Sequence, residues 1–214
     1  MNKRKRVLGY YNYTVVLTYI GMLAGFTGIV CAMEKSFCSA LFCLLVAGVC
    51  DMFDGAIAST RERNASEKRF GIQIDSLSDL ICFGMLPAAF VCSRGERSYL
   101  CFGIAGIYLL CTLIRLAYFN VLEEERQQSE GGRRRCYLGL PVTTMAVFLP
   151  AVNEVCRYRR TNSMMPYCAL LALAGIAYLA PVTIRKPEIF GKIALIVVGI
   201  VEFAALAAGA LWDV

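Results

Sequence analysis

Long apolar stretches, separated by short polar segments, run along almost the whole chain. A helix needs about 20 mostly apolar residues to cross a bilayer core about 30 Å thick. Seven stretches meet or approach that length, although the fifth is short and contains Pro150, and the pattern admits six to eight spans. They are residues 12–33, 37–58, 74–93, 98–120, 140–156, 166–184 and 190–212. The pattern predicts an all-α, polytopic integral membrane helical bundle, with residues 1–214 forming one domain.

Composition supports a membrane protein and excludes other classes. Of the 214 residues, 58% are apolar and 18% are charged, and the mean hydropathy is +0.58. Soluble domains carry roughly 25% charged residues, and disordered chains are richer still in polar ones. The basic run Lys3–Arg6 before the first apolar stretch resembles a signal peptide. The stretch is longer than a typical signal core, so we interpret it as a retained first helix.

Basic residues predict the orientation of the bundle. They gather around residues 3–6, 61–69, 126–135 and 185–192, in segments that alternate with less basic ones; the cluster at 157–160 is an exception. Because cytoplasmic loops are enriched in lysine and arginine, we expect a multi-pass protein of the cell membrane with these segments in the cytoplasm. The net charge of +6 is dispersed between the spans. This favours contact with membrane lipids and argues against nucleic acid as a partner.

The residue inventory narrows the possible chemistry. The chain has no histidine, which excludes an imidazole base or a histidine-bound metal. Its eleven cysteines include no Cys-x-x-Cys pair, and most lie within apolar runs, where cysteine behaves as a small hydrophobic residue. Acid–base chemistry must therefore come from carboxylates.

Four aspartates lie where carboxylates are costly, at the end of the second apolar stretch and the start of the third. They are Asp51, Asp54, Asp75 and Asp79. Spacings of three and four residues place each pair on one face of a helix, and two such faces together would form a cage of oxygens. Oxygen cages suit Mg²⁺ or Mn²⁺. Helix capping or a proton relay in a cation transporter would be the alternative explanation.

Small and basic residues accompany the aspartates. Gly55, Ala58 and Gly71 leave room on the same faces for a bulky ligand, and the loop between the pairs contains Arg61, Arg63, Lys68 and Arg69. A metal cage beside a basic loop is a suitable receptor for a diphosphate.

The segment 51–79 resembles a known signature, Asp-x-x-Asp-Gly-x-x-Ala followed by Gly-x-x-x-Asp-x-x-x-Asp. This is the pattern of the CDP-alcohol phosphatidyltransferases, and the similarity extends over roughly residues 10–145. The resemblance implies an integral membrane homodimer with a six-helix core. It also implies transfer of a phosphatidyl group from CDP-diacylglycerol to an alcohol, with release of CMP.

Within that family, the chain is most similar to the bacterial members that use L-serine. The similarity rests on residues 70–79, 82–87, 115–120 and 137–141. It implies an enzyme of phospholipid biosynthesis that forms phosphatidylserine. Glycerol 3-phosphate or inositol phosphate as the acceptor remains the alternative within the family, and a cation transporter the alternative outside it.

The resemblance also implies roles for individual residues. Asp51, Asp54 and Asp75 would hold two divalent ions, and Asp79 would be the general base and also touch a metal. The CDP-lipid would contact five residues, namely Gly55, Ala58, Ser59, Arg61 and Gly71.

Two positions qualify this assignment. Ser59 stands where the family usually has arginine, so we expect Arg61 to take over the phosphate contact. Arg115 would bind the serine carboxylate and Asn120 would add a polar contact; a snorkelling Arg115 and an Asn120 that ends its helix are the structural alternatives.

Overall fold

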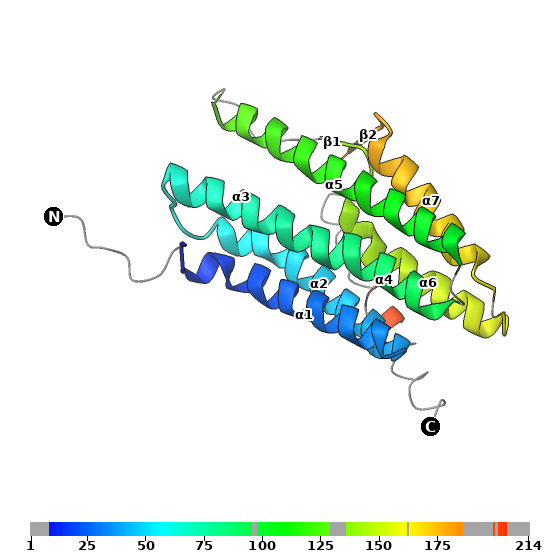
Figure 1. The fold of residues 1–214 in the computed structure, drawn as a ribbon. Coiled ribbons are helices and arrows are strands. Elements are labelled where there is room, and N and C mark those ends of the chain that lie inside the picture. Colours follow the sequence, from blue (N-terminus) through cyan, green and yellow to red (C-terminus); the bar gives the residue numbers. More distant parts are fainter. Residues whose placement is uncertain are drawn as a thin grey trace.

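The computed structural model describes residues 9–95, 98–128, 136–161, 163–185, 199 and 201–204. Helices dominate these ranges, and they lie side by side with their long axes roughly aligned (Figure 1). The helices are α1 (Val16–Met33), α2 (Phe37–Ala58), α3 (Ala65–Asp79), α4 (Leu86–Arg94), α5 (Tyr99–Gln128), α6 (Met145–Tyr158) and α7 (Met165–Leu179). The predicted all-α membrane bundle is confirmed.

The first four spans agree with the predicted apolar stretches. Within the described ranges, four helical segments are long and apolar enough to cross a membrane, namely 13–33, 37–58, 65–94 and 99–125, and α7 is a shorter apolar helix. The helix beginning at Ala65 starts well before the predicted residue 74, because Asn64 and Glu67 form a reciprocal capping box. The predicted span 190–212 lies almost wholly outside the described residues. Its described part contacts α2 through the rings of Phe203 and Phe42, whose centroids are 5.0 Å apart.

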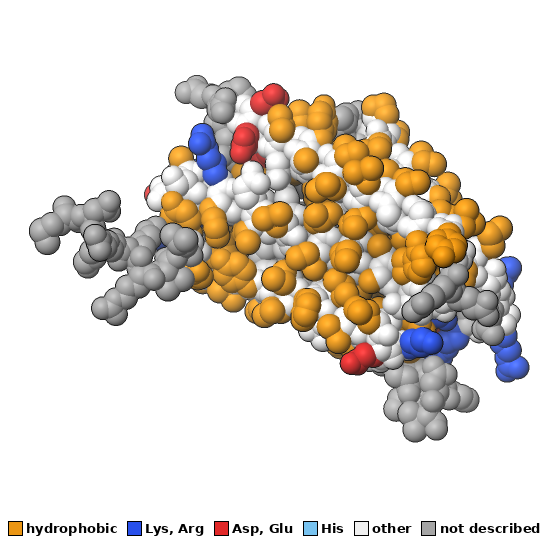
Figure 2. Space-filling model, in the orientation of Figure 1, with side chains coloured by type: hydrophobic (Ala, Val, Ile, Leu, Met, Phe, Trp, Pro, Cys, Tyr) orange, Lys and Arg blue, Asp and Glu red, His pale blue; other side chains and the backbone are white. Residues whose placement is uncertain are grey.

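The outside of the bundle is as apolar as its interior. Leu23, Phe26, Ile107, Leu173 and Ile176 are all more than half exposed. Apolar side chains cover most of the face seen in Figure 2, with charged ones gathered toward the two ends of the bundle. A soluble protein would not expose so continuous an apolar surface, whereas lipid solvates it without cost.

The core is one cluster to which α1, α2, α4, α5, α6 and α7 all contribute, and its largest fully buried side chains include Tyr108, Tyr167, Phe83 and Phe90. A π-helical turn, Leu80–Met85, joins α3 to α4 and directly follows Asp79. Pro87 has no N–H to donate to the carbonyl of Phe83, four residues earlier. The hydroxyl of Tyr108 donates to that carbonyl instead, which connects α5 to the π-helical turn.

Helix α1 packs closely against the helices that carry the aspartates. A Cβ on Gly25 would lie 2.6 Å from Sγ of Cys82, so glycine permits the close approach of α1 to this segment. The Ser78 hydroxyl donates to the carbonyl of Thr18 at 3.4 Å, and the Cys82 thiol donates to that of Gly21 at 3.2 Å. These contacts fix the register of α1 against the aspartate pair of α3.

Two short strands were not predicted. Strands β1 (Cys136–Leu138) and β2 (Thr183–Arg185) pair antiparallel, with Tyr137 opposite Ile184. The predicted sixth span therefore ends early, because the chain leaves the helix after Leu179. Gly139, with φ +76°, makes the turn into α6, and a Cβ there would lie 2.9 Å from the carbonyl oxygen of Tyr178.

Candidate active site

The two aspartate pairs face each other, as predicted. Asp51 and Asp54 project from the last two turns of α2, and Asp75 projects from α3. One carboxylate oxygen from each of these three residues lies within 4.8 Å of the other two. The chain thus brings together, from two helices, three carboxylates that could share one ion.

Asp79 lies at the edge of this group. Its carboxyl group lies close to that of Asp51, while the carboxyl group of Asp75 lies close to that of Asp54. Thr18 of α1 donates to Oδ2 of Asp54 at 3.5 Å. All four aspartates are partly buried.

This donor set fits a hard divalent cation. Ionised carboxylates in mutual contact repel each other, and a cation bound between them removes that repulsion. Carboxylate and hydroxyl oxygens are the donors that Mg²⁺ and Mn²⁺ prefer. The residues therefore fit the metal that the resemblance implies.

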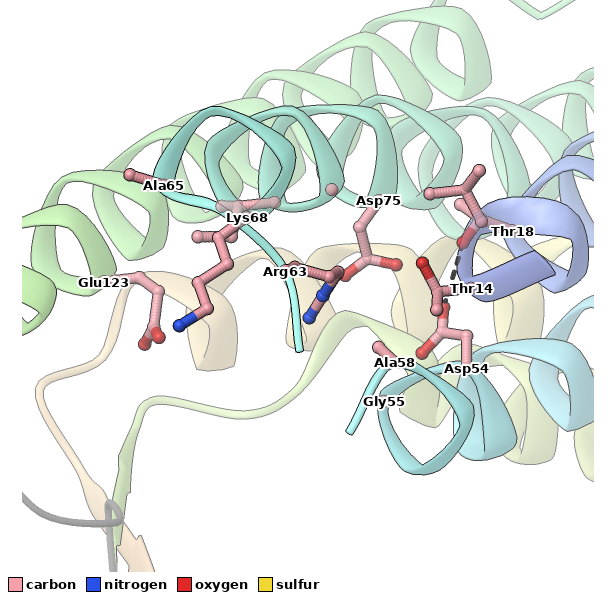
Figure 3. A pocket seen from close by; sticks show the side chains of 13 residues that line it. Thr14, Thr18, Asp54, Gly55, Ala58, Arg63, Ala65, Lys68, Asp75 and Glu123 are labelled. Carbon is pink, nitrogen blue, oxygen red and sulfur yellow. Dashed lines mark hydrogen bonds between the residues drawn. The ribbon is translucent and has the colours of Figure 1, made fainter. Parts of the chain in front are cut away.

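A cavity of about 560 Å³ opens beside the aspartates. Asp54 and Asp75 line one part of it, and Arg63 and Lys68 line another (Figure 3). Its remaining walls are contributed by Thr14, Val15, Thr18, Gly55, Ala58, Ala65, Gly71, Ile72 and Glu123. In this view the Lys68 side chain extends toward Glu123, and Arg63 lies between Lys68 and Asp75 (Figure 3). A cavity lined by both carboxylates and cations suits a ligand that carries both a bound metal and negative charge.

The predicted small residues line the cavity, and the absence of a side chain at Gly71 explains how Arg63 enters it. Gly55 has no atom within 4 Å of the position that a Cβ would occupy, so this wall is open. A Cβ on Gly71 would lie 2.9 Å from Nη1 of Arg63. Glycine at position 71 therefore leaves the space in which the Arg63 guanidinium lies.

Arg63, and not the predicted Arg61, reaches the cavity. Arg61 is exposed and lies 3.8 Å from a carboxylate oxygen of Glu67, away from the cavity lining. Arg63 is partly buried, and its Nε is buried with no hydrogen-bond partner among the described residues. In the sequence, Arg63 is one of several basic residues of the loop, and nothing marks it as the one that reaches the cavity. The loop has no periodicity from which the direction of each side chain could be predicted.

Ser59, Arg115 and Asn120 also lie outside the cavity lining. Ser59 ends α2, where its hydroxyl donates to the carbonyl of Ala56 at 2.6 Å. Asn120 accepts a 2.7 Å hydrogen bond from the hydroxyl of Ser76, the neighbour of Asp75. Arg115 is 9% exposed, and its Nη1 lies 3.4 Å from the position of a Cβ on Gly139. Burial excludes the snorkelling alternative for Arg115.

Comparison with known sequences agrees with this geometry. The sequence model of the CDP-alcohol phosphatidyltransferase family matches residues 11–178. The chain belongs to the CDP-alcohol phosphatidyltransferase family. The match contains every aspartate and every cavity residue described above, so these residues are part of the family domain.

Three curated relatives show which proteins the chain is similar to in sequence. A CDP-diacylglycerol–serine O-phosphatidyltransferase of Saccharomyces cerevisiae is 34% identical over 143 residues, which are 61% of this chain and 51% of the relative. One of the same name from Methanocaldococcus jannaschii is 29% identical over 88% of this chain and 86% of the relative. An archaetidylserine synthase of Methanothermobacter thermautotrophicus is 26% identical over 83% of this chain and 74% of the relative. The chain thus spans about half of the yeast relative and most of the two archaeal ones.

Proposed function

We propose that this chain transfers the phosphatidyl group of CDP-diacylglycerol to the hydroxyl of L-serine, giving phosphatidylserine and CMP. The observation that carries the proposal is one cavity lined by carboxylates from α2 and α3 together with Arg63 and Lys68. The names of the three relatives all include serine, whereas they differ in the lipid. Serine is therefore the acceptor that the comparisons favour.

Asp51, Asp54 and Asp75 would hold the divalent ions, Mg²⁺ or Mn²⁺, and we propose two of them, with Asp79 touching one. Bound there, divalent ions would polarise the diphosphate and stabilise the departing CMP. Arg63 would contact the diphosphate in place of the arginine that the family usually has at position 59, and Lys68 would add a second positive charge. The open wall at Gly55 and Ala58 would admit the nucleotide.

Asp79 would be the general base for the serine hydroxyl. No histidine is present in the chain, and Asp79 lies next to the metal group through its contact with Asp51. The acceptor would approach from the side of Ser76 and Asn120, which join α3 to α5 beside Asp75. Arg115 would bind the serine carboxylate through its guanidinium fork.

The cavity would face the cytoplasm of a cell-membrane protein. The first helix begins, α2 ends and α3 begins at the end of the bundle that holds the cavity, and the basic segment 61–69 joins α2 to α3 there. Cytoplasmic serine could then reach the site without crossing the bilayer. A homodimer is the assembly that family membership favours, and light scattering of the detergent-solubilised protein would test it.

A cation pathway is less consistent with this site. Arg63 and Lys68 line the same cavity as Asp54 and Asp75, and positive charges there would repel a permeating cation. Those charges instead favour an anionic substrate.

The experiment is CMP release by the purified protein in detergent with CDP-diacylglycerol and Mg²⁺ or Mn²⁺. L-serine, glycerol 3-phosphate and inositol phosphate are compared as acceptors, with and without a chelator. We expect CMP release that requires both serine and metal. Release with another acceptor would keep the chemistry and reject the serine assignment, and no release with any acceptor would reject the proposed function.

A further inference from the structure

Two thiols meet at the end of the bundle remote from the aspartates. Cys101 is in the first turn of α5 and Cys168 is in the first turn of α7, and their Sγ atoms are 3.3 Å apart. The two residues are 8% and 6% exposed. Helices α5 and α7 run side by side here (Figure 1), so the pair joins segments 67 positions apart in the sequence.

A second cavity gives small molecules a route to both thiols. It measures about 900 Å³ and lies between the beginnings of α5 and α7. Cys101 and Cys168 both line it, together with Arg94, Ser98 and mainly apolar residues such as Ile104 and Ala172. The proposed phosphatidyl transfer uses none of these residues.

The geometry of the pair suits covalent closure. A disulfide bond is about 2.05 Å long, so the two sulfur atoms would have to approach by about 1.3 Å, a distance within the reach of side-chain rotation. Cys111 provides the contrast on the same two helices. Its Sγ faces Gly175, at 3.5 Å from the position that a Cβ there would occupy.

We propose that Cys101 and Cys168 form a reversible dithiol–disulfide site that reacts with small disulfides entering the second cavity. The thiolate of one cysteine attacks a sulfur of the reagent, forms a mixed disulfide and releases one reagent thiol. The other cysteine then attacks the protein sulfur of that mixed disulfide and releases the second reagent thiol. Two S–H bonds are lost and one S–S bond forms, while the two protons and two electrons leave with the reagent thiols.

The site ties the beginning of α5 to the beginning of α7. The crosslink would close a loop of more than 60 residues that includes α6. Such a crosslink lowers the conformational entropy of the unfolded chain, and the effect grows with the length of the loop. The oxidised protein should therefore unfold at a higher temperature than the reduced one. Because the bond lies far from the aspartates, phosphatidyl transfer should change little.

The test uses the full-length protein in detergent, reduced and then freed of reductant. It is treated with 4,4′-dithiodipyridine, its remaining thiols are blocked with N-ethylmaleimide, and its peptides are mapped by mass spectrometry. We expect a peptide crosslinked between Cys101 and Cys168 that dithiothreitol separates. Separate pyridyl adducts on the two cysteines of the wild type, or no reaction at either, would overturn the proposal.

Three cysteine variants and a second thiol reagent test the same pairing independently of the crosslinked peptide. Cys101→Ser should leave a stable pyridyl adduct on Cys168, and Cys168→Ser the converse, whereas the control Cys111→Ser should keep the crosslink. Phenylarsine oxide bridges two adjacent thiols with loss of one water. It should bridge the two peptides that contain Cys101 and Cys168 in the wild type and in Cys111→Ser. A bridge between these peptides in Cys101→Ser or Cys168→Ser would contradict the proposal.

Discussion

The two ends of this bundle treat buried polar groups differently. At the end where α1 begins, four aspartates contact one another beside a cavity that also contains the unpartnered Nε of Arg63. At the other end, Arg94 lies over the rings of Phe37, Phe90 and Tyr167 at 4.8 to 5.7 Å, and the Tyr167 hydroxyl donates to Asn153 at 3.2 Å. At that end Glu154 and Arg157 also form an ion pair at 3.8 Å, so the charged groups there lie beside aromatic rings or groups of opposite charge.

This difference distinguishes a ligand site at the aspartate end from structural packing at the Arg94 end. Carboxylates held close together repel one another unless a cation lies between them, so the group formed by Asp51, Asp54 and Asp75 indicates where a ligand binds. Groups that have protein partners fix the packing of helices. Substitutions at the two ends should therefore affect different properties, namely activity at the first end and stability at the second.

The largest effect is expected from the aspartates, and two variants distinguish their roles. Asp75→Asn removes a proposed metal ligand, so both metal-dependent binding of the CDP-lipid and turnover should be lost. Asp79→Asn removes the proposed base but leaves the group of three carboxylates, so turnover should fall by about 10²–10⁴-fold with lipid binding largely retained. Initial rates and lipid-binding isotherms measure the two quantities. An Asp79→Asn variant that keeps more than a few per cent of activity would show that Asp79 is not the base.

Arg63 and Arg61 form a matched pair in the same loop. Arg63→Gln removes a charged donor from the cavity, which should raise the KM for CDP-diacylglycerol by about tenfold or more. Arg61→Gln breaks only an exposed ion pair with Glu67, which is worth little, so KM should change by less than about twofold. Equal effects of the two substitutions would remove Arg63 from the phosphate site.

Arg115→Lys tests the acceptor. Lysine keeps the charge but loses the two-pronged guanidinium, so the KM for serine should rise several-fold while the KM for CDP-diacylglycerol stays unchanged. Steady-state kinetics with each substrate varied in turn separates the two constants. An unchanged KM for serine would assign Arg115 to packing beneath the Gly139 turn.

The smallest effect on activity is expected at Tyr108. Tyr108→Phe leaves the carbonyl of Phe83 without its donor and should lower the free energy of unfolding by about 1–3 kcal/mol. The specific activity of the folded protein should stay close to that of the wild type. Tyr118→Phe, on the lipid-facing side of the same helix, is the control and should unfold at the wild-type temperature. A Tyr108→Phe variant as stable as this control would contradict the role given to Pro87 and Tyr108.

Much of the fold and part of the site could be predicted from the sequence, because they depend on local periodicity. Apolar runs predicted α1, α2 and α5 to within a few residues at the ends that begin them, and the spacings of the aspartates predicted that Asp51 and Asp54 would face Asp75. The capping box at Asn64 and Glu67 can be recognised in the sequence and predicts the early start of α3. It was missed because the first turns of that helix are polar.

What could not be predicted depends on contacts between distant segments. Arg63 enters the cavity because Gly71 leaves space for it, and nothing in the loop sequence distinguishes Arg63 from Arg61. The carbonyl of Phe83 in the π-helical turn after Asp79 finds its donor in Tyr108, which is on another helix. The pairing of β1 with β2 joins segments more than 40 residues apart, each only three residues long, and neither carries a strong strand pattern.

The most direct test of the account is to locate manganese in the protein bound to CDP-diacylglycerol. A crystal structure with anomalous data would show the ion and the diphosphate together. The account predicts manganese coordinated by Asp51, Asp54 and Asp75, with the Arg63 guanidinium on the diphosphate. Manganese elsewhere, or a CDP-lipid bound outside the cavity between α2 and α3, would contradict it.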